Sequence, residues 1–139
     1  MESFEYYIAK KEVVKQTPNL ERAKSLIEDG FSRFKDAKSL DLEKFPKIVF
    51  ENVYDALRDF CDAILIVDGW KSYSHEASIS YLTKKGFDIA SVLELDRFRY
   101  KRNGSKYYGE RVSISEARNI KAYFLKIIVK LDKFISDIK

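Results

Sequence analysis

The sequence predicts an all-α protein, an up-and-down antiparallel bundle of four to five helices. Only two Pro and five Gly occur in 139 residues, so long stretches are free to be helical. Apolar side chains recur at three- and four-residue steps over most of the chain, which is the period of a helix with one buried face. No alternation of apolar and polar residues, the pattern of a half-buried strand, continues for any length.

The N-terminal part of the chain predicts an extension followed by the first long helix. Residues 1–16 are expected to be an N-terminal extension or a short helix, and residues 17–139 the bundle domain. Pro18 suits the first turn of a helix, with Thr17 as the cap before it. The apolar stripe that follows predicts a helix over residues 18–40.

A second helix is predicted over residues 45–68. Pro46 opens it, and Gly69 is well placed to end it. Its apolar content is higher than that of the first helix, which favours a place at the centre of the bundle. Cys61 lies on the apolar face and is expected to be a small buried hydrophobe. Residues 69–73 are expected to form a polar turn.

The third helix is predicted to begin at a Ser74 cap and to end at Gly86. The fourth begins near Asp88 and continues into a basic segment. The Asn103-Gly104 pair is expected either to end that helix or to loosen it.

The last helix has the clearest pattern in the chain. Ser113-Ile114-Ser115-Glu116 has the spacing of a capping box, and a regular apolar stripe follows it from Ala117 to Ile138. Phe124 and Leu131 lie on this stripe and are expected to be buried. Truncation of either to Ala is expected to cost about 2–5 kcal/mol.

Composition excludes several classes of protein. The longest aliphatic run, residues 63–67, is far shorter than the roughly 20 residues that span a bilayer. Glu2 and Glu5 stand where a signal peptide would carry basic residues. Together with the single cysteine, these features predict a cytoplasmic protein that does not bind a membrane. One His and one Cys do not make a usual zinc site, and no glycine-rich phosphate loop is present, so neither metal nor cofactor is expected.

Positive charge is concentrated in residues 97–111. This segment contains six basic residues and a single acid, Glu110. Its net charge therefore exceeds that of the whole chain, which is formally +4. Such a patch attracts phosphates, and the tyrosines among its charges offer faces for stacking on bases. The alternatives are a solvated helix end, or a cluster offset by acids from elsewhere in the fold. The candidate binding residues are Arg97, Arg99, Lys101, Arg102, Lys106, Tyr108 and Arg111.

Other titratable residues have mainly structural interpretations. His75 titrates near neutral pH and is a candidate general base, but a lone His at a helix start more often caps or packs. Asp55, Asp59 and Asp62 recur on one helix and are expected to be surface charges rather than catalytic pairs.

The order of these pieces resembles the HEPN domain family. The resemblance covers about residues 17–139 and rests on the first helix, on the segment from Val53 through Gly69-Trp70-Lys71-Ser72 to His75, and on Arg102-Asn103 followed by Tyr107-Tyr108-Gly109. It implies a helical bundle that pairs as a two-fold homodimer and joins both motif copies in one cleft. Many members are metal-independent ribonucleases, and some are toxins neutralised by a small nucleotidyltransferase.

The resemblance implies Arg102, Asn103 and Tyr107 as the catalytic positions, but Tyr107 stands where the family has His. A phenol titrates near 10, so almost none is in the basic form at neutral pH. The loss of a general base typically costs about 10²–10⁴-fold in rate. The sequence therefore favours a protein that binds RNA or a nucleotide phosphate without cleaving it. A weak ribonuclease, with a nucleotidyltransferase antitoxin as partner, and a structural protein are the alternatives.

Overall fold

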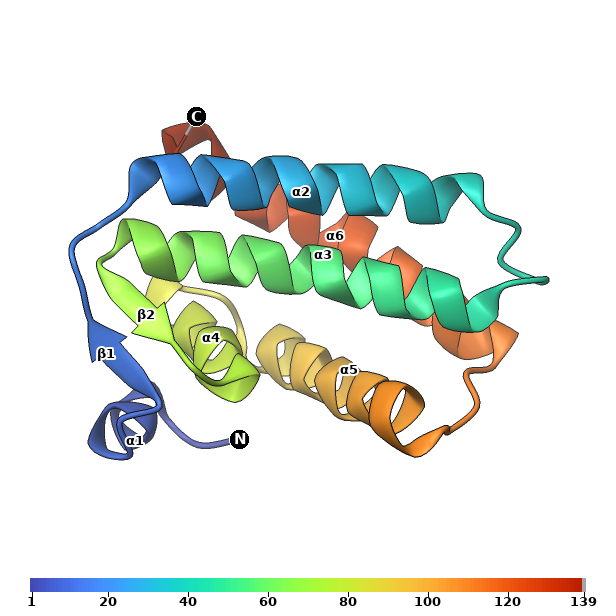
Figure 1. The fold of residues 1–139 in the computed structure, drawn as a ribbon, viewed down its shortest axis with the longest axis horizontal. Coiled ribbons are helices and arrows are strands. Elements are labelled where there is room, and N and C mark those ends of the chain that lie inside the picture. The colour runs from blue at the N-terminus through green and yellow to red at the C-terminus, as the bar shows by residue number, and fades with distance from the viewer. Residues whose placement is uncertain (139) are drawn as a thin grey trace.

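The structure, a computed structural model, describes residues 1–138, and its four long helices alternate in direction (Figure 1). The predicted all-α, up-and-down antiparallel bundle is therefore confirmed. The long helices are α2 (Leu20–Ser39), α3 (Pro46–Val67), α5 (Ile89–Tyr108) and α6 (Ile114–Ile138). Shorter elements precede and interrupt them: α1 (Phe4–Ala9), β1 (Val13–Lys15), β2 (Trp70–Ser72), α4 (His75–Ser80) and the 3₁₀ helix η1 (Tyr81–Lys85).

Helix α3 lies at the centre, as its apolar content predicts. It packs against α2 along its length and also contacts α4, α5 and α6. Phe60 of α3 lies 5.9 Å between ring centroids from Phe124 of α6, which in turn stacks on Phe34 of α2 at 3.8 Å. These aromatic contacts join three helices into one core. Cys61 is buried in it, as expected.

The structure adds a small antiparallel sheet that the sequence pattern does not predict. Val13 pairs with Ser72, and Lys15 with Trp70. Three residues are too few to show a period of two. Within residues 1–16 the expected short helix forms as α1, and the strand β1 follows it. The expected polar turn after α3 is wrong, since it contains β2.

Most helix ends follow the local sequence, and the start of α2 is an exception. The cap of α2 is Asn19 rather than Thr17: the Asn19 Oδ1 accepts a hydrogen bond from the Arg22 backbone N–H at 2.9 Å. Ser74 caps α4 as predicted. Gly86 ends η1 in the left-handed conformation, with φ of 85°.

The capping box at the start of α6 forms in full. The Ser113 backbone N–H donates to Glu116 Oε1 at 2.9 Å, and the Glu116 N–H donates to Ser113 Oγ at 3.0 Å. Helix α5, by contrast, does not end at residues 103–104. It continues to Tyr108 and ends at Gly109, whose φ of 68° suits glycine.

The N-terminal segment packs on the β2 side of the bundle. Phe4 and Tyr7 are buried with Leu65 and Ala77 in a second apolar cluster. The Phe4 ring meets the Trp70 ring edge to face, with 5.2 Å between centroids. Among residues 1–138, no helix has the length and apolar content needed to cross a bilayer.

Candidate nucleic-acid interface

The basic segment covers the second half of α5 and the turn into α6. Its tyrosines are open: the exposed fractions of Tyr100, Tyr107 and Tyr108 are 74%, 64% and 82%. Tyr100 and Tyr107 are seven residues apart, so they lie on the same side of the helix, roughly 10 Å apart along its axis. A row of open rings of this kind offers stacking platforms.

Half of the six cations are offset by acids, an outcome that the sequence left open. The Arg99 Nε lies 2.7 Å from Asp96 Oδ1, and its Nη2 lies 3.5 Å from Glu76 Oε1 on α4. The Lys101 Nζ lies 3.2 Å from Glu116 Oε2 and donates to the Arg111 carbonyl at 2.6 Å.

The third offset cation, Arg102, is buried rather than exposed. Only 2% of it is accessible. Its Nη2 donates to Asp55 Oδ1 of α3 at 3.0 Å. The guanidinium carbon lies 5.6 Å from the Tyr54 ring centroid and 6.0 Å from that of Tyr107. The motif arginine is therefore held between two rings and a carboxylate, beneath the surface.

Two of the Arg102 donors lack partners in the described part of the chain. Nε and Nη1 are buried, and no acceptor lies within hydrogen-bond reach of either. An unmade bond of this kind costs about 1–3 kcal/mol. The two ring contacts offset part of that cost, at roughly 0.5–2 kcal/mol each. The neighbouring Ser105 Oγ is buried and unpartnered as well.

The remaining three cations are free of acids. Arg97, Lys106 and Arg111 are exposed, and none forms a salt bridge with a residue in the range 1–138. Lys106 lies over the Tyr107 ring at 5.8 Å. Asn103, the second motif residue, is half-buried. We call the exposed cations and the open tyrosines together the α5 surface, which wraps around the helix because Arg97 and Lys106 are half a turn apart: Arg97, Tyr100, Lys106, Tyr107, Tyr108 and Arg111.

His75 lies closer to the motif arginine than the sequence indicates. Its Nδ1 is 3.5 Å from the Tyr54 hydroxyl, and the ring of the same tyrosine faces the Arg102 guanidinium. Burial, and then the positive charges of Arg58, Arg102, Arg99 and Lys106, lower the pKa of His75 to about 4. The imidazole is therefore neutral at pH 7 and a weak base.

The three aspartates of α3 are not the surface charges that their spacing predicts. Asp55 holds Arg102, and Asp59 pairs with Arg33 of α2 at 3.0 Å. Asp62 accepts a hydrogen bond from Ser78 Oγ at 2.8 Å. A burial signal was present in the sequence, since these aspartates alternate with the apolar positions of the most apolar helix. Their partners lie on other elements and leave no mark in the sequence.

In residues 1–138, no three His, Cys, Asp or Glu side chains lie together in a way that would hold a metal ion. Comparison with models of protein families, with curated proteins and with solved structures found no match. The architecture is that of an all-α helical bundle, and exposed tyrosines and cations gather along the second half of α5. The resemblance to the HEPN family stays a prediction.

Proposed function

We propose that this chain is an RNA-binding protein of the HEPN type, which binds single-stranded RNA on the α5 surface without cleaving it. The observation that carries the proposal is the combination of three open tyrosine rings with three cations that form no ion pair with an acid in residues 1–138. Stacking supplies base contacts that tolerate any sequence, and the cations contact phosphates. A nucleotide alone would use only a small part of a surface two helical turns long.

Arg102 has a positioning role in this proposal. Its guanidinium is buried, so it acts through the Tyr107 ring that it faces rather than by touching RNA. Asp55 also holds the guanidinium, by accepting a hydrogen bond from its Nη2. Loss of the guanidinium would let the Tyr107 ring move and would weaken binding indirectly.

Binding of a fluorescent single-stranded RNA of about 12 nucleotides, followed by anisotropy, tests the proposal. We expect Tyr100→Ala and Tyr108→Ala each to weaken binding by on the order of 5- to 100-fold, the cost of one lost stack. We expect Lys106→Gln and Arg111→Gln each to reduce the slope of log affinity against log salt by about 0.7.

Tyr6→Ala is the matched control, because Tyr6 belongs to α1 and α1 lies at the opposite end of the view from the end of α5 (Figure 1). An equal loss of affinity in Tyr6→Ala would overturn the proposal. So would the absence of any binding by the unaltered protein at low salt, where phosphate contacts are strongest.

We further propose that the protein acts as a homodimer. Large apolar side chains are exposed at i, i+4 spacing on two long helices: Ile89 and Leu93 on α5, and Leu125 and Val129 on α6. Exposed apolar groups that repeat along a helix mark contact surfaces. Light scattering on Leu125→Glu/Val129→Glu is expected to give a monomer mass where the unaltered chain gives a dimer. A monomer in both cases would contradict this assembly.

A ribonuclease, with a nucleotidyltransferase antitoxin as partner, is the second candidate, and one observation favours it. His75 and Arg102 contact the same side chain, that of Tyr54: His75 meets its hydroxyl, and Arg102 meets its ring. The low pKa of His75 argues against efficient base catalysis at pH 7, because a general base works best with a pKa near the working pH. Incubation with total RNA in EDTA, alongside His75→Ala and Arg102→Ala, decides between the two. Cleavage that both substitutions abolish would establish the second candidate.

A further inference from the structure

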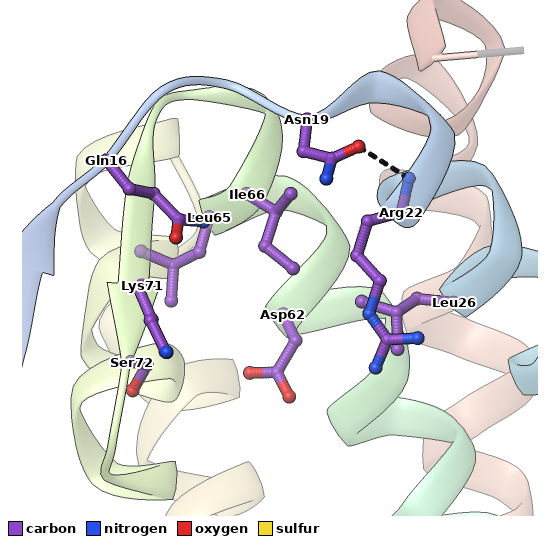
Figure 2. A pocket seen from close by; sticks show the side chains of 9 residues that line it. All are labelled: Gln16, Asn19, Arg22, Leu26, Asp62, Leu65, Ile66, Lys71 and Ser72. Carbon is purple, nitrogen blue, oxygen red and sulfur yellow. Dashed lines mark hydrogen bonds between the residues drawn. The ribbon is translucent and has the colours of Figure 1, made fainter.

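A cavity separate from the α5 surface lies where α2 begins, α3 ends and β2 follows α3 (Figure 2). Its volume is about 320 Å³, at the lower end of the range for small-molecule sites. None of its lining residues belongs to α5. Its lining is mixed, with the apolar side chains of Leu26, Leu65 and Ile66 among six polar residues.

A carboxylate lies at the centre of this cavity. Asp62 projects from α3 between Arg22 of α2 on one side and Lys71 of β2 on the other (Figure 2). Its Oδ1 accepts from Ser78 Oγ at 2.8 Å, and its Oδ2 lies 3.6 Å from the Arg58 Nε. Two carboxylate oxygens offer about four acceptor sites, so Asp62 has capacity beyond these contacts.

The two flanking cations are not used by the fold. In the described part of the chain, Arg22 and Lys71 form no salt bridge with any acid. Arg22 is exposed, and so is Lys71, whose Nζ rests 5.1 Å from the Tyr73 ring centroid. The cavity thus presents two positive charges that have no ion-pair partner in residues 1–138. They flank a carboxylate, Asp62, each of whose oxygens already has one contact.

This arrangement selects for one kind of ligand. Two cations attract an anion, but the Asp62 carboxylate repels an anion that brings no hydrogen-bond donor. A singly protonated phosphate satisfies both, since its charged oxygens meet the cations and its P–OH donates to the carboxylate. The volume exceeds that of a phosphate group, and the apolar side chains in the lining suit an organic substituent. We propose that this cavity binds a small phosphate monoester in its singly protonated form.

The environment of Asp62 is consistent with a shared proton. Burial raises the pKa of Asp62 above its usual value, against the lowering effects of Ser78, Arg58 and Arg22. Because the second pKa of a phosphate monoester is about 6, affinity is expected to fall as the pH rises from 6 to 8.

Phenyl phosphate and phenyl sulfate are the matched probes, since they share shape and an anionic group and the sulfate carries no donor. Titration by calorimetry at pH 6 is expected to show phenyl phosphate binding on the order of tenfold more tightly than phenyl sulfate. In Asp62→Asn the preference is expected to fall to about threefold or less, because the amide no longer repels the bare anion. Arg22→Gln and Lys71→Gln are expected to weaken phenyl phosphate by about tenfold each.

Arg33→Gln, which removes a cation of α2 outside the cavity, is the control and is expected to leave the affinity unchanged. The comparison of the two probes on the unaltered protein needs no variant to fold. Equal binding of both probes, an unchanged preference in Asp62→Asn, or no saturable binding of phenyl phosphate would each overturn the proposal. RNA binding on the α5 surface does not enter this test, so the two proposals fail separately.

Discussion

At the scale of single residues, the charges that matter here are buried ones with few partners. Arg102 has one carboxylate partner, Asp55, and two donors without any in the described part of the chain. Removal of one member of a buried ion pair leaves the other charge desolvated and unpaired, which is far more costly than the loss of an exposed pair. His75 shows the same effect in another form, because its neighbours make the charged imidazole unfavourable.

We expect Asp55→Ala to lower the free energy of unfolding by about 3 kcal/mol, since it leaves the Arg102 guanidinium buried without a carboxylate. Urea unfolding at pH 7 measures this. Glu43→Ala is the control, because Glu43 pairs with Arg118 at the surface and both side chains are more than half exposed. That change should cost less than about 1 kcal/mol. Equal costs for both variants would show that Arg102 does not depend on Asp55.

We expect His75 to make the protein less stable in acid. Its pKa is about 4 in the fold against a reference value of 6.5, so between these values the unfolded chain binds more protons. Stability therefore falls as the pH drops from 7 towards 4. For a half-buried group this amounts to about 1–2 kcal/mol. Unfolding free energies at pH 7 and 4.5 should differ less in His75→Gln, and parallel pH profiles would contradict the assignment.

At the scale of elements, α6 shows how far local sequence can define a helix. Its capping box satisfies two orphan backbone donors at the first turn, and its stripe of apolar side chains faces α2 and α3. The Phe124 ring stacks on Phe34, and Leu131 is 1% exposed. Burial of both was expected from the sequence and is confirmed.

Truncation of either side chain should therefore be costly. We expect Phe124→Ala and Leu131→Ala each to lower the free energy of unfolding by about 2–5 kcal/mol, through lost burial and the cavity left behind. Lys126→Ala on the same helix is the control, since Lys126 is exposed, and should change stability by less than about 0.5 kcal/mol. Chemical denaturation of the three variants under one condition decides whether the helix register is right.

At the scale of the whole molecule, the N-terminal segment is joined to the bundle rather than appended to it. The Tyr7 hydroxyl donates to Glu76 Oε2 at 3.0 Å, and Glu76 in turn contacts Arg99 of α5. Phe4 is 3% exposed within the second apolar cluster. These contacts connect the first residues of the chain to the neighbourhood of His75 and Arg102.

We expect Phe4→Ala to destabilise the entire protein by about 3–5 kcal/mol in a single cooperative transition. Ile8→Ala, on the same short helix, should cost less than about 1 kcal/mol because Ile8 is 39% exposed. Fluorescence and circular dichroism should report the same midpoint for each variant. An early, separate transition in Phe4→Ala would show that the N-terminal segment folds on its own.

Sequence patterns were enough to predict the class of fold, the approximate ranges of the four long helices, the caps at Ser74 and Ser113, and the burial of Cys61 and Phe124. Each of these depends on residues within a few turns of one another, so a period or a spacing records it. Only the tertiary structure decided that Arg102 is buried against Asp55, that His75 comes near it, and that β1 pairs with β2. Those contacts join residues that are distant in the chain. Their free energy comes from desolvation and from partners on other elements, and neither leaves a period in the sequence.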